Sequence, residues 1–488
     1  MRQLVLIIII SLLYCNFSYC TIVNITAPDY KNQTLSWKRK IDYITNSFEK
    51  IDHTTIDSNG YGKLNYDFKQ IELTEISIGR SHGLIYIDTA TNQYNIYFPK
   101  DTIIDQASLK KSEIQLVFLN LKENDINNLI LDFNYELDFF LYGDTSKIVR
   151  MVRHDKEFQE ALNNFKIYLS NRYKDKMIKY LHNYIRYEIA VLEQLANQSK
   201  GEFYKAYLYE NYINNKELNY SNDAYMQFFN QFYKDVFKIG GSQLNKEILL
   251  AINNNDFEKL NDMIKNSKYF SSDQISEFAI IKGLFDSYSL SQYSPQNILL
   301  FLDNISKKSK WKSHRELANN CIIELTKFSI GAICPNITLI DKKNNIIKVD
   351  QLKKNYTYIN FFASWNYKSL KEMEIIKKFH ENYSFINFIS INLDNNKADF
   401  EKFLANNSNY KWQILYPKNK QELISEFHID DLPTHLLIDP KGLISQYPAL
   451  PPSPLSKGYQ SSTIDETFFN IKKKNKVEEK MNIGRKNY

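Results

Sequence analysis

The sequence is poor in cysteine. Its 488 residues contain four, and two of these, Cys15 and Cys20, fall within the first twenty positions. The remaining two, Cys321 and Cys334, stand far apart in the chain and make a poor metal site, so no bound metal is expected. They could pair as a disulfide in an oxidising compartment, whereas Cys321 also fits a helical stripe in which a cysteine packs as a small buried hydrophobe.

Long hydrophobic runs are also scarce. The apolar segment Leu4–Leu13 follows Arg2 and is shorter than the roughly 20 residues of a membrane span, which is typical of a secretory signal. We therefore expect residues 1–20 to be a signal peptide and the mature protein to be exported to the periplasm or cell envelope. Cys15 and Cys20 would allow a lipoprotein instead, although each follows a bulky tyrosine where such signals carry a small residue. Membrane association is expected only in that case.

Neither sign of charge is concentrated in one region. The formal net charge is +6, and lysines are interspersed with acidic residues through most of the chain. Because no basic stripe interleaves with exposed aromatic residues, a nucleic-acid partner is not expected. The one basic run begins at Lys472–Lys476 and predicts a disordered tail over residues 472–488, with attachment to an anionic surface as the alternative.

Glycines number only 13, and the pair in Ile239–Ser242 does not form a phosphate loop. No earlier glycine stands at the required spacing and no Lys-Ser/Thr pair follows. The pair fits the end of a helix better, and no cofactor is expected.

The chain is long enough for two or three domains. Residues 21–121 carry short β-branched and aromatic runs, namely Ile22–Ile25, Gly83–Ile87 and Tyr94–Pro99, and Asp57–Gly60 has the composition of a hairpin turn. These features predict an N-terminal β-sandwich-like domain with antiparallel strands. Because the segment contains no evident cluster of titratable residues, a binding or spacer module is the favoured interpretation.

Residues 122–330 predict a central α-helical region. Aromatic residues recur at three- and four-residue steps in Tyr225–Phe237, and a similar stripe contains Tyr180, Tyr184, Tyr187 and Leu192. Such stripes usually form a core, and a groove for a partner is the alternative.

Residues 331–471 alternate between strand and helix patterns. Strands are predicted over Ile337–Asp341, Tyr356–Phe362 and Phe388–Leu393, and helices over Glu372–Tyr383 and Asp399–Ala405. This alternation predicts an α/β domain with a mixed sheet. The whole chain is thus expected to be a multi-domain α+β protein.

One segment of this last domain indicates a family. The chain carries, in order, Gly331, Cys334-Pro335, Asn360-Phe361-Phe362-Ala363-Ser364-Trp365, Glu372-Met373, Leu432-Pro433-Thr434 and Leu437-Ile438-Asp439 followed by Gly442. This order resembles the TlpA-like branch of the thioredoxin superfamily, and the whole chain resembles multi-domain TlpA-like proteins exported by Bacteroidota. The resemblance implies a thioredoxin-like fold, a cis bond before Pro433, and a binding surface around Trp365, Tyr367, Leu432, Pro433 and Thr434.

The chain departs from this family at the two sulfur positions of the Cys-x-x-Cys motif, which read Asn366 and Ser369. Dithiol exchange needs a thiolate and a second thiol to resolve the mixed disulfide. An amide and a hydroxyl can do neither, so we expect no catalytic residue at this degenerate motif. Ser369 could act as a nucleophile only with a nearby base, for which His428 and His435 are the candidates in the implied fold.

Two functions follow from this pattern. The favoured one is a noncatalytic exported protein that binds a protein or peptide at the thioredoxin groove, where the proline loop leaves backbone groups free to pair with an added strand. The alternative is a thiol-disulfide oxidoreductase in periplasmic redox homeostasis that acts through a non-standard cysteine such as Cys334.

Overall fold

The structure is a computed structural model, and it describes residues 20–102, 109–143, 155–197, 200–238, 241–270, 272–348, 355–454 and 462–484. The expected signal peptide lies outside the described residues apart from Cys20. The chain divides into two compact units, one with residues up to Asp101 and Glu113–Glu324, the other with Thr102–Ser112 and the chain from Leu325 onward. Within the described residues, no helix is both long and apolar enough to cross a membrane.

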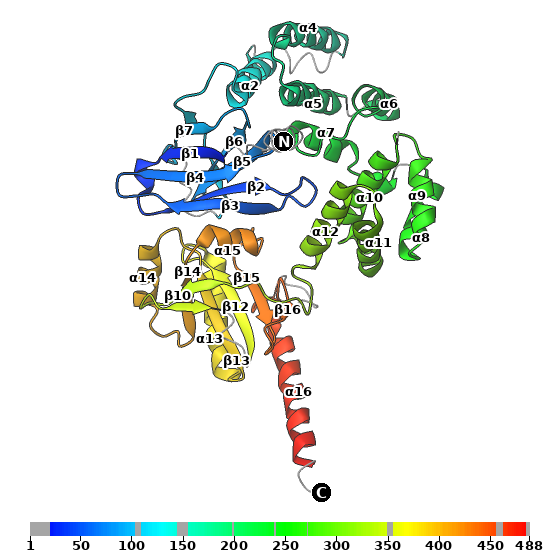
Figure 1. Ribbon diagram of the computed structural model, residues 1–488. Coiled ribbons are helices and arrows are strands. Elements are labelled where there is room, and N and C mark those ends of the chain that lie inside the picture. Colours follow the sequence, from blue (N-terminus) through cyan, green and yellow to red (C-terminus); the bar gives the residue numbers. More distant parts are fainter. Residues whose placement is uncertain are drawn as a thin grey trace, which may run out of the picture. The chain divides into compact units, whose positions relative to one another are not determined.

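The N-terminal unit opens with two β-sheets that share one core (Figure 1). The four-stranded sheet has the order β4 (Tyr61–Asp67), β1 (Cys20–Thr26), β7 (Gln93–Tyr97), β9 (Val117–Phe118). The five-stranded sheet has the order β3 (Phe48–Thr55), β2 (Thr34–Lys40), β5 (Glu72–Ile78), β6 (Ser81–Ile87), β8 (Ser112–Glu113). A 3₁₀ turn, η1, covers Pro28–Tyr30. The sandwich-like domain expected from the sequence is therefore present.

Two details of the sandwich differ from the prediction. β1 and β7 pair in parallel, because the chain passes through the second sheet between them. The turn at Asp57–Gly60 exists, but it joins β3 and β4, which belong to different sheets, so it is not a hairpin turn. Gly60 is required there because its φ is +88° and a Cβ would lie 2.7 Å from Pro28 Cα.

The central region is helical, as predicted, and belongs to the same compact unit as the sandwich. Its helices are α2 (Ile126–Tyr142), α4 (Asp155–Tyr173), α5 (Lys179–Ala196), α6 (Gly201–Tyr212), α7 (Asp223–Phe232), α8 (Ser242–Asn253), α9 (Phe257–Lys265), α10 (Asp273–Ser287), α11 (Pro295–Lys308) and α12 (Lys312–Thr326), with the 3₁₀ turn η3 at Val236–Lys238.

The aromatic stripes of this region pack against each other and form core. Tyr187 on α5 meets Tyr225 on α7 edge to face, with ring centroids 4.7 Å apart, and both rings are buried. The aromatic helix is shorter than predicted, because α7 ends at Phe232 and η3 follows separately. Gly241 stands at the N-cap of α8 rather than at the end of the aromatic helix, and residues 239–240 lie outside the described residues.

The C-terminal unit contains a seven-stranded mixed sheet. Its order is β11 (Ile346–Lys348), β10 (Thr338–Ile340), β14 (Gln413–Pro417), β13 (Ile386–Asn392), β12 (Tyr356–Phe362), β15 (Thr434–Ile438), β16 (Ile444–Gln446). β12, β13 and β14 run parallel, and β15 is antiparallel to β12. The helices are α13 (Tyr367–Asn382), α14 (Lys397–Asn406), α15 (Lys420–Glu426) and α16 (Ile464–Gly484).

Helices cover both faces of this sheet. Apolar residues of α13, α14 and α16 pack with Tyr358 and Phe362 of β12 on one face, and α15 packs with Ile359 and Phe361 on the other. Helix α16 continues to Gly484, past residue 472, where the sequence predicts a disordered tail to begin. The segment has no proline, and its Lys, Glu and Met residues favour helix.

Candidate functional site

The candidate site is the start of helix α13, directly after the buried strand β12. Asn366 is the N-cap of the helix, with φ of −93° and ψ of 109°, and its side-chain oxygen accepts a hydrogen bond from Ser369 N at 2.9 Å. An extended N-cap residue whose side chain bonds the third helical N–H is the usual way to begin a helix. Asn366, at the first of the two motif positions, therefore caps the start of the helix.

The second position, Ser369, points into the protein. Its side chain is fully buried, and its hydroxyl has no hydrogen-bond partner among the described residues. Neither candidate base reaches it. His428 is exposed and contacts Phe328 edge to face at 5.8 Å, and His435 is bonded to a carboxylate. Among the described residues, Ser369 therefore has no base within hydrogen-bond reach to activate it as a nucleophile.

A buried polar network lies behind the helix start. His435 Nε2 is 2.8 Å from Glu372 Oε2, and Ser453 Oγ donates to Glu372 Oε1 at 2.8 Å. The imidazole also stacks on Tyr358 with ring centroids 5.3 Å apart. Glu372 and His435 are at most 2% exposed, so the network holds α13 against β15 and keeps the carboxylate and the imidazole away from solvent.

Two buried polar atoms beside this network have no hydrogen-bond partner among the described residues. They are His435 Nδ1 and Asn360 Oδ1. Asn360 and His435 are paired neighbours on β12 and β15, and Asn360 Nδ2 donates to Met373 Sδ at 3.2 Å. Burial also raises the pKa of Tyr358 well above its usual value, so this phenol stays neutral and donates to Leu450 O at 3.0 Å.

The loop between β12 and α13 is held by Asp394. Its carboxylate accepts from Ser364 N at 2.7 Å and from Asn392 Nδ2 at 2.9 Å, and it is fully buried. Sequence reasoning missed Asp394 and Ser453 as partners. A signal for Asp394 existed, because an acidic residue directly after a buried strand must find donors. Ser453 is 81 residues from Glu372 and has no local signal.

The predicted binding residues gather at one end of the sheet but differ in access. The Leu432–Pro433 bond is cis, as the resemblance implied. Thr434 begins β15 opposite Phe361 and donates to Asp431 O at 2.6 Å. Tyr367 is 72% exposed, with Lys371 Nζ 4.5 Å from its ring centroid. Trp365 packs against the core cluster that contains Leu432, and its buried Nε1 lacks a partner among the described residues.

The two cysteines do not form the disulfide considered from the sequence. Cys321 is fully buried on α12, and Cys334 is 7% exposed in the core of the C-terminal unit. Each thiol packs inside its own core, as a small hydrophobe does. Burial raises the pKa of Cys321 well above its usual value. Across the part of the chain that is described, no three His, Cys, Asp or Glu residues gather as a metal site.

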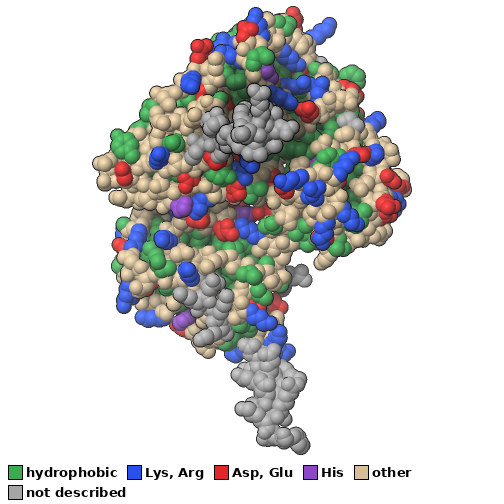
Figure 2. All heavy atoms as spheres, viewed as in Figure 1, with side chains coloured by type: hydrophobic (Ala, Val, Ile, Leu, Met, Phe, Trp, Pro, Cys, Tyr) green, Lys and Arg blue, Asp and Glu red, His purple; other side chains and the backbone are tan. Residues whose placement is uncertain are grey.

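Charged side chains of both signs are mixed over the visible face of the protein. On the face shown in Figure 2, Lys and Arg side chains alternate with Asp and Glu. This view agrees with the interspersed charges of the sequence, and it shows no single-signed stripe of the kind that binds nucleic acid.

Comparison with known proteins assigns the C-terminal unit. Residues 354–444 match a family model described as thioredoxin-like. The thiol-disulfide oxidoreductase ResA of Bacillus thuringiensis (strain Al Hakam) is 28% identical over 119 residues, which are 24% of this chain and 68% of that protein. ResA of Geobacillus kaustophilus (strain HTA426) is 23% identical over 129 residues, which are 26% of this chain and 73% of that protein.

Solved structures give similar matches. A thioredoxin-like protein from Bacteroides caccae has 13% identity and a TM-score of 0.29, and the match covers 51% of this chain and 89% of that one. The thioredoxin domain of a thiol-disulfide oxidoreductase from Bacteroides vulgatus has 18% identity and a TM-score of 0.23, covering 30% of this chain and 96% of that one. The C-terminal unit thus contains a thioredoxin-like domain with thiol-disulfide oxidoreductase homologues, and the expected fold class is confirmed.

Proposed function

We propose that this protein is an exported, noncatalytic binding protein whose thioredoxin-like domain holds a protein or peptide beside Pro433. One observation carries the proposal: Asn366 Oδ1 accepts the Ser369 N–H at 2.9 Å. In thiol-disulfide exchange, free N–H groups and the helix dipole at such a position stabilise a thiolate. Here a neutral amide uses that donor, and an amide cannot attack a disulfide.

The neighbouring proline loop offers groups for binding. The ladder between β12 and β15 ends at the pair Phe361–Thr434, and within the described residues neither the N–H nor the C=O of Leu432 makes a hydrogen bond. Leu432 lies in the loop before the inner strand β15, and unpaired backbone groups there can bond the backbone of an extended chain. Tyr367, exposed at the helix start, supplies an aromatic contact at low rotamer cost. Trp365 supports the core instead.

The alternative, an oxidoreductase like the relatives named above, lacks an accessible thiol. Those relatives are called thiol-disulfide oxidoreductases, and their names are the support for this alternative. In the described part of this chain the cysteines with known exposure are Cys321 and Cys334, both buried. The thiolate is the attacking species, and burial disfavours it.

Redox activity is tested on the purified mature protein with an insulin reduction assay in dithiothreitol. We expect a rate equal to that of dithiothreitol alone. The matched control is the same protein with Cys334→Ser, which should give the same rate. Turnover comparable to that of an intact Cys-x-x-Cys enzyme would refute the noncatalytic assignment, and its loss in Cys334→Ser would support the alternative.

Peptide binding is tested by selection from a random peptide library, followed by titration of the best peptide. We expect Tyr367→Ala to weaken binding by about 1 kcal/mol or more, which is about fivefold in Kd. Tyr135→Ala is the matched control, because Tyr135 is 68% exposed but lies on α2. If no peptide is selected, or if both variants bind as well as the parent, the surface around Tyr367 and Pro433 is not the binding site.

Export is supported by the sequence pattern of residues 1–20. Amino-terminal sequencing of the protein recovered from the cell envelope should show that this segment has been removed. Recovery of the uncleaved chain from the cytoplasm would contradict this part of the proposal.

A further inference from the structure

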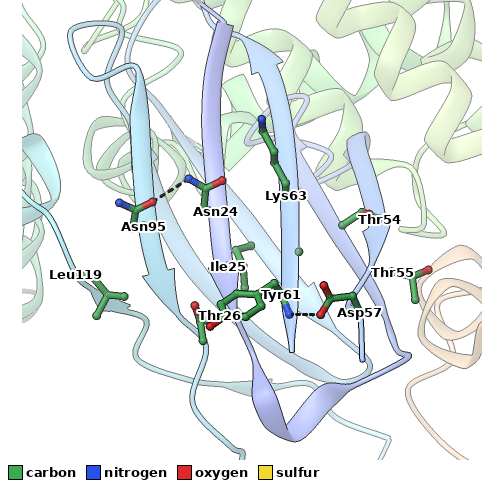
Figure 3. A pocket seen from close by; sticks show the side chains of 11 residues that line it. Asn24, Ile25, Thr26, Thr54, Thr55, Asp57, Tyr61, Lys63, Asn95 and Leu119 are labelled. Atoms are coloured by element: carbon green, nitrogen blue, oxygen red, sulfur yellow. Dashed lines mark hydrogen bonds between the residues drawn. The ribbon is translucent and has the colours of Figure 1, made fainter. Parts of the chain in front are cut away.

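A second candidate site lies in the N-terminal unit, on the outer face of the sheet β4-β1-β7-β9. A groove of about 650 Å³ opens there, lined by residues of β1, β3, β4 and β7, by the β3–β4 turn and by Leu119 after β9 (Figure 3). Its lining is rich in amide and hydroxyl side chains, and it contains one lysine, Lys63, and one carboxylate, Asp57. The sequence favours a binding or spacer module for residues 21–121 but indicates no surface or ligand, and the thioredoxin resemblance assigns no role here.

Strand register arranges the polar side chains of this face in rows. Lys63 on β4, Asn24 on β1 and Asn95 on β7 are direct neighbours across three strands. Two residues further along, Tyr61 and Thr26 form the next row on the same face. The residues that alternate with these rows face the other way and are buried in the sandwich core, as Val23 and Ile25 are. Figure 3 shows the first three side chains side by side.

The amides in the first row keep hydrogen-bonding capacity. Asn24 Nδ2 donates to Asn95 Oδ1 at 2.9 Å, and Gln93 Nε2 donates to the same oxygen at 3.1 Å. Each Asn side chain has one acceptor oxygen and a two-proton donor nitrogen. Among the described residues, Asn24 Oδ1 and Asn95 Nδ2 have no partner, and Lys63 forms no ion pair. The row therefore presents an acceptor, an amide donor and an ammonium donor to the groove.

We propose that this groove binds an oligosaccharide. Adjacent strands lie about 4.8 Å apart, so the row spaces its donors and acceptors over a distance that suits hydroxyls on alternate carbons of a sugar ring, each of which both donates and accepts. Tyr61, which is 57% exposed at the end of the groove, offers an aromatic face to the apolar side of a sugar ring. Thr26, Thr54 and Thr55 add hydroxyl groups to the wall.

Other ligand classes fit this face less well. β1 is paired on both sides, with β4 and with β7, so an extended peptide could add only along the edge strand β4, where the Asn65 N–H is already bonded to Asp52 Oδ2. A phosphate-rich polymer needs several cations in line, whereas the groove holds one lysine and one carboxylate. A ligand recognised through hydroxyl groups uses the side chains that are available.

The test is saturation-transfer difference NMR with full-length mature protein and four separate probes: maltohexaose, cellohexaose, xylohexaose and chitohexaose. We expect transfer to at least one probe, and loss of that signal in the double variant Asn24→Ala with Asn95→Ala. Tyr61→Ala should weaken binding by about three- to tenfold, the range for loss of one modest contact. Thermal unfolding of each variant shows that it is folded.

Asn65→Ala is the matched control. Asn65 lies on the same face of β4 as Lys63 but does not line the groove, and only its backbone N–H is bonded, to Asp52 Oδ2 at 2.7 Å. Its variant should bind the probe as the parent does. The proposal is overturned if no probe shows transfer, if the folded double variant binds as well as the parent, or if Asn65→Ala abolishes binding equally.

Discussion

Asparagine is used in opposite ways at the two candidate sites. At the start of α13, Asn366 turns its amide oxygen back onto its own helix and accepts the Ser369 N–H. On the outer sheet face, Asn24 and Asn95 share one bond and direct their remaining groups outward. Asparagine thus uses its acceptor within the helix at one site (the closed site) and keeps donors and acceptors available to a ligand at the other (the open site).

The difference follows from what the backbone needs at each place. The first N–H groups of a helix have no partner within it, so the side chain of Asn366 accepts one of them as a cap. β1 satisfies its backbone groups by pairing with β4 and with β7, so its outward side chains are not needed for that purpose. A thioredoxin-like domain can therefore begin this helix without a cysteine, and outward side chains on a paired strand stay available for other contacts.

The contrast between the two sites is tested most directly by placing cysteines at both motif positions at the start of α13. Asn366→Cys with Ser369→Cys should place a dithiol at the start of α13, where the helix dipole and free N–H groups lower the pKa of the first thiol. We expect insulin reduction to rise from none to a measurable rate, checked together with iodoacetamide alkylation against pH. The single variant Asn366→Cys is the control and should not turn over. A folded double variant whose thiols never form a disulfide would show that the local geometry is unsuited to exchange.

The largest effect on stability is expected behind the closed site. Glu372→Ala leaves His435 and Ser453 without their buried partner, and loss of one member of such a pair costs about 3–5 kcal/mol. Urea unfolding followed by tryptophan fluorescence measures the change in the free energy of unfolding. Glu372→Gln, which keeps the shape and one acceptor oxygen, should cost less. A loss below about 1 kcal/mol for Glu372→Ala would mean that the network does not hold the helix.

The cap itself should have a smaller effect. Asn366→Ala removes the acceptor for Ser369 N and is expected to lower the free energy of unfolding by about 1 kcal/mol, whereas Asn366→Asp should retain most of the stability. Both are measured by the same urea titration. Equal stability of the alanine and parent proteins would indicate that water replaces the amide at this helix start.

Substitutions on the outer sheet face should change the free energy of unfolding least. Asn24→Ala and Asn95→Ala remove side chains that face solvent, so each should change the free energy of unfolding by less than about 0.5 kcal/mol. A larger loss would show that the Asn24–Asn95 bond supports the sheet and would weaken the contrast with Asn366. Thermal denaturation of the single variants measures this directly.

Local patterns anticipated much of the C-terminal unit. The strand Tyr356–Phe362 was predicted at its observed bounds, because a run rich in aromatic and β-branched residues ends there before Ala363 and Ser364. The asparagine three residues before Ser369 is a local cap signal, although the sequence interpretation considered it only as a lost cysteine. The aromatic helix was predicted too long, since its periodicity continues through Val236 and Phe237 while the chain turns after Phe232.

The sequence by itself determined the types and order of the elements and the absence of sulfur at positions 366 and 369, because periodicity and residue identity are local properties. Only the tertiary structure decided which polar groups meet. His435 bonds Glu372 across 63 residues, and Asn24 bonds Asn95 across 71. Such contacts depend on strand register and on helix packing against the sheet, which are settled by the burial of apolar faces over the whole unit. For that reason the sequence does not show that Asn24 and Asn95 lie side by side on one face, whereas the folded protein does.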